Sequence, residues 1–330
     1  MGLISRFFSF CLPAPSLSPD TQTGLDRVLV LVDKKLGAMP GFAARLAVPV
    51  AHARAYCAKL VHALPPAIEI SRQHFATSPL VHALFATADD IDALFAASTP
   101  VRAFLSETVS WKQECFIALL AARRVEKKVF GSAIQGNVLM ADVPQSLLLF
   151  SNQTLLLPAV DSDAAHAALL EAAFDSLLQT FAGHLDRARE AYTSLQAERE
   201  LERVRQRTQP TGHEGVAFPE RRLAALDERL RERFQSLQPG VVIDELARFL
   251  MAPEQALALE PVQMWVSRSG VIQEEGAHSE DAMLVRFMEL KSRDRRLHLV
   301  LPVRIAYDEA RQAIARSQAG RAAREYMLLL

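Results

Sequence analysis

The stretch from Phe174 to Leu195 constrains the fold of this chain more than any other part of its sequence. Apolar residues there recur alternately four and three residues apart, at Phe174, Leu178, Phe181, Leu185, Ala188, Tyr192 and Leu195. This spacing gives a helix one continuous apolar seam, of the kind that pairs helices in coiled coils. The seam ends where Arg199 and Glu202 take its next positions. We therefore predict a helix over residues 161–208 whose seam must be buried against another helix.

A second helix is predicted after the loop PTGHEGVAF, in the segment PERRLAALDERLRERFQSLQPG. Its apolar stripe consists of Leu223, Leu226, Leu230, Phe234 and Leu237, and its ends carry the proline and glycine that suit a helix start and stop. Helices so rich in charge are marginal in isolation, so we expect the two to fold back on each other as a coiled-coil-like helical hairpin, residues 161–239. We further expect this arm to contact a second copy or a protein partner through Phe174, Leu178, Phe181, Leu185, Tyr192, Leu195, Leu223, Leu230 and Phe234.

The remaining segments predict a helix-dominated α+β fold. Residues 21–129 read as a helical domain, and its last helix starts at Thr99 and continues past Cys115 and Phe116, which lie on its expected buried face. Turn residues divide residues 130–160 into three or four short antiparallel strands, a small β-meander. The C-terminal α+β domain, residues 240–330, is expected to hold a second antiparallel meander with flanking helices. Whether the two meanders share one sheet is left open.

Residues 1–20 are expected to form an apolar helix followed by a linker rich in proline and serine. Leu3, Ile4, Phe7 and Phe8 fall on one face of that helix. A secretory signal, a lipoprotein signal and a myristoylation site each fail at a specific residue of this segment. We expect the helix to dock into a groove on this protein or on a partner. Contact with a membrane interface stays open as an alternative, although a single arginine is few for that role.

The totals exclude several classes of protein. The chain has 37 basic and 38 acidic residues, a balance that gives no long-range attraction for nucleic acid. No stretch approaches the about 20 apolar residues that a membrane-spanning helix needs. Three scattered cysteines, Cys11, Cys57 and Cys115, show neither the pairing of secreted disulfide proteins nor the spacing of zinc sites. We therefore expect a cytoplasmic protein with no specific nucleic-acid partner, membrane-associated only if its N-terminal helix binds lipid.

No constellation of residues predicts catalysis, a cofactor or a metal ion. The glycines form no phosphate-binding fingerprint. Asp163 and His166 are three residues apart, but no second pair of metal ligands accompanies them. The sequence thus predicts no catalytic, cofactor-binding or metal residues, and it favours a non-catalytic interaction or scaffold protein that pairs through its helical arm. Two alternatives stay open: a peripheral membrane protein anchored by residues 2–12, and an enzyme whose site is assembled from distant residues.

Overall fold

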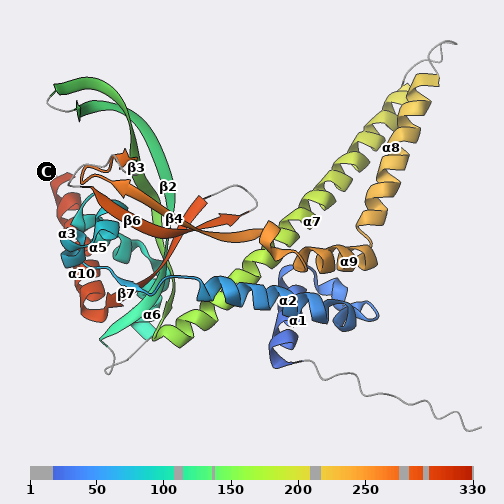
Figure 1. Ribbon diagram of the computed structural model, residues 1–330. Helices are drawn as coiled ribbons and strands as arrows, with labels where there is room; N and C mark the ends of the chain where they lie inside the picture. Colours follow the sequence, from blue (N-terminus) through green and yellow to red (C-terminus); the bar gives the residue numbers. More distant parts are fainter. Residues whose placement is uncertain are drawn as a thin grey trace, which may run out of the picture. The chain divides into compact units, whose positions relative to one another are not determined.

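The computed structural model confirms that the chain is a helix-dominated α+β protein (Figure 1). It describes residues 18–107, 114–135, 138–208, 217–274, 282–292 and 297–328. These residues form two compact units, each assembled from two separate stretches of chain: 1–55 with 178–252, and 56–177 with 253–330. Helices α2 (Phe42–His62) and α7 (Ser162–Thr208) contribute residues to both units.

The first unit is helical. It contains α1 (Pro19–Leu31), the 3-10 helix η1 (Lys34–Ala38), most of α2, the second part of α7, α8 (Ala217–Ser236) and α9 (Pro239–Leu250). The Ser18 side chain caps α1 by accepting a hydrogen bond from the Thr21 amide at 3.2 Å, and Pro19 fits the first turn because its position needs no donor. Arg54 of α2, buried, forms an ion pair with Asp20 of α1. The predicted helical hairpin is confirmed, with α8 running back along α7 (Figure 1).

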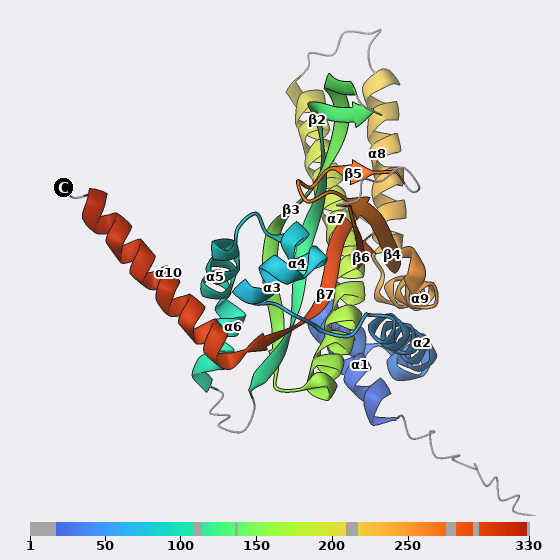
Figure 2. The same cartoon turned by 60° about the vertical axis from the view of Figure 1, so that its left-hand side comes forward.

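The second unit holds the sheet and a layer of short helices. The helices are α3 (Arg72–Thr77), α4 (Pro79–Leu84), α5 (Ala88–Ala97), α6 (Thr99–Glu107), the 3-10 helix η2 (Pro253–Gln255) and α10 (Tyr307–Leu328), with the start of α7 and the end of α2. The start of α5 is a capping box, in which the Asp90 carboxylate accepts a hydrogen bond from the Thr87 amide at 2.7 Å. Figure 2 shows α3–α6 together on one side of the strands.

Seven strands form one sheet. Its order is β3–β2–β7–β6–β4–β5, with β1 paired in parallel to β7 and the other pairs antiparallel. The strands are β1 (Ile68–Glu69), β2 (Cys115–Gln135), β3 (Val138–Ala159), β4 (Leu257–Val266), β5 (Ile272–Gln273), β6 (Met283–Ser292) and β7 (Leu297–Ala306). Residues 115–123 of β2 pair with residues 298–306 of β7. The two segments predicted as separate meanders therefore belong to a single sheet.

One helix prediction is wrong. The helix that begins at Thr99 ends at Glu107, and Cys115 and Phe116 begin strand β2. The run CFIALLAA is apolar at almost every position, which fits a strand covered on both faces as well as a buried helix. Phe116, Ala118, Leu120 and Ala122 alternate into the main core, so the period in this segment is two. Trp111, expected on the same helix, lies outside the described residues.

The segment 130–160 is antiparallel as predicted, but it contains two long strands in place of three or four short ones. The residues interpreted as turns at 143–144 and 151–153 lie at or beside irregularities within β3. Asp142 and Asn152 have positive φ angles of 59° and 54°, and the pairing with β2 shifts register nearby. An edge strand tolerates proline and bulges because one of its edges needs no ladder hydrogen bonds. The polar residues therefore bend the strand without ending it.

The main core lies between one face of the sheet and the helices α4, α5, α6 and α10. Its fully buried side chains include Phe95 of α5, Phe116 of β2 and Ile305 of β7. Phe116 also packs against Phe104 and Tyr307, with ring centroids 5.4 and 5.2 Å apart. This packing holds the helical layer against the strands.

Candidate functional site

The helical arm, the predicted interaction site, is built mainly from buried residues. Phe174 and Leu178 are completely buried, and Phe181, Leu185, Leu195 and Leu230 are less than a tenth exposed. Tyr192 and Leu223 are half-buried, and Phe234 is 54% exposed. The other predicted contact residues, Leu3, Ile4, Phe7 and Phe8, lie outside the described residues.

Helix α8 covers the distal part of the α7 seam. Leu195 of α7 forms an apolar cluster with Leu226 and Leu230 of α8, and Tyr192 packs against it. The rings of Tyr192 and Phe234 lie 6.2 Å apart. Contacts of this kind already remove the seam from water, as coiled-coil packing requires. These buried residues therefore hold the two helices of the hairpin together. Their contact with a partner stays a prediction.

Ion pairs continue the seam where its apolar residues end. Arg199 of α7 lies 2.5 Å from Asp227 of α8, and Arg222 of α8 lies 3.4 Å from Glu198 and 3.7 Å from Glu202. Glu202 is only 7% exposed. Charged residues thus replace leucines at the interface of the two helices, which explains why the sequence pattern stops at Leu195 although the helices continue side by side. Partly exposed pairs of this kind contribute little energy each.

A second apolar surface lies on the outer side of α7. Ala197, Leu201 and Val204 are exposed and stand four and three residues apart; Leu201 is 61% and Val204 is 54% exposed. At about 100° per residue they point away from the buried positions Leu195 and Glu202. We call these three residues the outer stripe. The sequence analysis did not predict the outer stripe, because most residues around it are charged. The three-residue spacing of Leu201 and Val204 was the one feature that could have indicated it.

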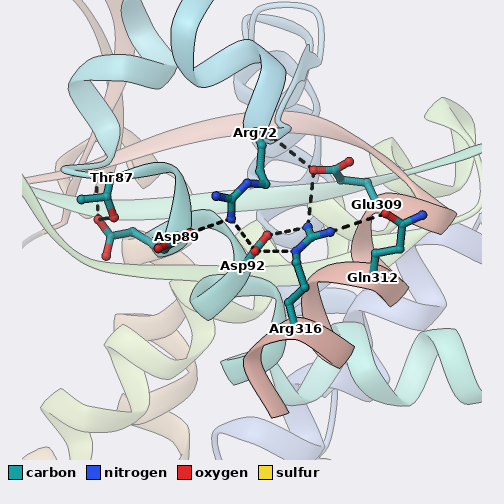
Figure 3. A network of polar contacts seen from close by, with 8 residues as sticks. Arg72, Thr87, Asp89, Asp92, Glu309, Gln312 and Arg316 are labelled. Atoms are coloured by element: carbon teal, nitrogen blue, oxygen red, sulfur yellow. Dashed lines mark hydrogen bonds and ion pairs between the residues drawn. The ribbon is translucent and has the colours of Figure 1, made fainter. Parts of the chain in front are cut away.

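A network of charges joins three helices of the second unit (Figure 3). Asp92 of α5 is 5% exposed. Arg316 of α10 donates to its two oxygens from Nε at 2.8 Å and from Nη2 at 2.9 Å, and Arg72 of α3 donates from Nη1 at 2.7 Å. The same Arg72 nitrogen lies 2.7 Å from Asp89, and the Arg72 amide donates to Glu309 at 3.2 Å. Arg316 Nη2 also lies 4.0 Å from Glu309, so the guanidinium groups of Arg72 and Arg316 each meet two carboxylates.

The charges of this network hold α3, α5 and α10 together. The hydrogen bonds from Arg316 lower the pKa of the Asp92 carboxyl below its ordinary value, with a further contribution from Arg72, while burial opposes the shift. A carboxylate held ionised in this way, with both oxygens occupied, is a poor base for proton transfer near neutral pH. Asp89 and Asp90 lie in the first turn of α5, where acidic residues suit the helix dipole. Asp90 has that role, whereas Asp92 neutralises two arginines.

An apolar cavity lies on the face of the sheet opposite the main core. Its volume is about 150 Å³, and its lining contains leucine, valine and alanine with a single serine, Ser176. Sequence reasoning could not predict it, because six elements contribute to its lining.

Asp163 and His166, the pair of possible metal ligands in the sequence, both lie in the first turns of α7. His166, the sequence candidate beside Asp163, stacks on His62 with ring centroids 6.0 Å apart. Within the described ranges, no group of three or more histidine, cysteine, aspartate or glutamate residues could hold a metal ion. In the same part of the chain, no helix combines the length and apolarity needed to cross a membrane.

Comparisons with known proteins add no assignment. No family model matches the sequence, and neither the curated proteins nor the solved structures contain a significant match to it.

Proposed function

We propose that this chain is a non-catalytic, cytoplasmic interaction protein that pairs with a second copy of itself through the α7–α8 arm. The observation that carries the proposal is the outer stripe: its two large side chains, Leu201 and Val204, expose more than half of their surface. Apolar side chains that stay exposed in a row on a helix suit contact with another helix. The seam contributes by holding α8 against α7, so that the stripe is presented on a paired arm.

The pattern of the stripe supports pairing between identical copies. Its spacing of four and three residues is the one that lets a second helix lie along it. Glu198 and Glu200 precede Leu201 in the sequence, and Arg203 and Arg205 follow it. Each of these four residues already forms an ion pair within the chain, Glu198 with Arg222 of α8. A two-fold pairing sets the same surface against itself, and an antiparallel arrangement brings acidic flanks near basic ones. A partner helix with the same spacing would fit too, but self-association needs no added protein and is therefore tested first.

The cytoplasmic location rests on the cysteines. Cys57 and Cys115, the two cysteines in the described part of the chain, form no disulfide there, which agrees with a reducing compartment.

Light scattering coupled to size-exclusion chromatography, over a series of protein concentrations, tests the proposal. The wild type is expected to show a molar mass that rises with concentration towards that of a dimer. Leu201→Glu combined with Val204→Glu puts two charges into the stripe and is expected to give a monomer at every concentration. Val30→Glu, at a position of α1 that is 62% exposed, is the matched control and should associate like the wild type. A wild type that stays monomeric throughout, or a double variant that associates equally well, contradicts the proposal.

A further inference from the structure

The floor of the apolar cavity is a continuous patch of the sheet. Four adjacent strands contribute to it, with Leu119 from β2, Val300 from β7, Leu290 from β6, and Leu257 and Leu259 from β4. Leu259 and Leu290 are directly opposite each other in the β4–β6 ladder. Side chains at alternate positions of these strands point to the other face and form the main core. The floor is therefore set by the backbone pairing of the strands and does not depend on a flexible loop.

Two helix segments of the same unit form the walls. The end of α2 and the turn after it supply Leu60, Val61 and Leu64, and the start of α7 supplies Leu169, Ala172, Ala173 and Ser176. The Tyr56 hydroxyl donates a hydrogen bond to the carbonyl of Leu257 at 2.7 Å, which fixes α2 against the first residue of β4. Ala172 and Ala173 are too short to fill the space between α7 and the strands. The hollow is thus framed by regular elements, as preformed ligand sites are.

Several of the lining leucines remain in contact with water. Leu60, Leu64, Leu119, Leu259 and Leu290 are only half-buried. The cavity is therefore open on one side, and a molecule can enter without unfolding the unit. Covering these side chains removes apolar surface from water, which favours binding.

From this geometry we propose that the cavity is a binding site for a small uncharged apolar molecule, such as a benzene-sized ring or the end of a short hydrocarbon chain. Among the described residues, no charged side chain belongs to its lining, so an ionised ligand would lose its hydration without gaining a partner there. The volume of about 150 Å³ matches apolar cavities known to take up benzene. This site does not include the outer stripe, and it goes beyond the proposed function.

Benzene is a suitable probe, and methyl-labelled NMR of the full chain is a suitable readout. Titration with benzene is expected to shift the methyl signals of Leu169, Leu290 and Val300, while methyls of the main core, such as those of Ile305, stay in place. Ala173→Leu fills the cavity from α7 and is expected to weaken benzene binding by about tenfold or more. Ala167→Leu adds the same group at an exposed position of the same helix and should bind like the wild type.

A second variant covers the case in which Ala173→Leu fails to fold. Leu290→Ala widens the floor and is expected to make the protein bind the larger probe n-butylbenzene more tightly than the wild type does. The proposal is overturned if benzene shifts none of the lining methyls of the wild type. It is also overturned if folded Ala173→Leu binds benzene as tightly as the wild type, or if Leu290→Ala gains nothing for the larger probe.

Discussion

Asp92→Asn is the substitution whose consequence follows most fully from the geometry. The carboxylate accepts three hydrogen bonds from Arg72 and Arg316. A hydrogen bond to a charged group contributes about 1.5–3 kcal/mol, but both arginine side chains are 41% exposed, so water replaces part of each contact after the substitution. Discounting each bond to about 1 kcal/mol, we expect the free energy of unfolding to fall by about 2–3 kcal/mol. Urea unfolding followed by tryptophan fluorescence measures it, because Trp265 lies in β4 of the same unit.

The pH dependence of this loss provides the stricter test. Because the folded pKa of Asp92 is lowered, its contribution is complete above the pKa of an unfolded aspartate, about 3.9, and disappears as the pH falls through the folded pKa. The difference between wild type and Asp92→Asn should therefore be full at pH 7 and vanish in strong acid. Asp89→Asn, whose side chain is 81% exposed, is the control and should change stability by less than about 0.5 kcal/mol. The reasoning is refuted if Asp92→Asn costs no more than this control, or if its cost is undiminished below pH 2.

Two further pairs of substitutions test the packing and the backbone conformation, all by urea unfolding. Leu195→Ala, inside the α7–α8 cluster, is expected to cost about 2–4 kcal/mol. Leu201→Ala, on the outer stripe, should cost under about 0.5 kcal/mol when unfolding is measured at a protein concentration at which the chain is monomeric; equal losses would contradict the assignment of the seam. Gly270→Ala should cost about 1–2 kcal/mol, because its φ is +86° and the new Cβ would lie 3.2 Å from Leu147. Gly183→Ala, where a Cβ meets nothing within 4 Å, should instead gain about 0.5–1 kcal/mol; a loss there as large as at Gly270 would contradict this account.

The sequence predicted those features that depend on contacts between near neighbours in the chain. The seam from Phe174 to Leu195 and the α8 stripe both depend on the spacing of residues close together in the sequence. The strand at Cys115–Ala122 was mistaken for a helix because a run that is apolar at almost every position has no visible period. The alternation of its side chains between the two faces of the sheet becomes visible only in the structure, where Phe116 and Leu120 face the main core.

Features assembled from distant residues could not be predicted. Asp92 and Arg316 are 224 residues apart, and neither has a local pattern that distinguishes it from an ordinary helix-surface charge. The cavity combines two helices with four strands, so no spacing in the sequence reveals it. The outer stripe is an intermediate case, since its spacing is local but its exposure depends on where α8 packs.

The central claim is that two copies of the chain meet through the outer face of α7. Disulfide trapping tests this most directly, because it reports which residues of the two copies come into contact. Leu201→Cys places a thiol at the centre of the outer stripe, where an antiparallel two-fold pairing through the stripe brings the two copies of residue 201 together. Mild oxidation should convert this variant to a covalent dimer, well above the background that the native cysteines give in the wild type. Arg231→Cys, at a position of α8 that is 63% exposed, should stay at background. Equal trapping at the two positions, or none at residue 201, would contradict the claim that the arm pairs through its outer face.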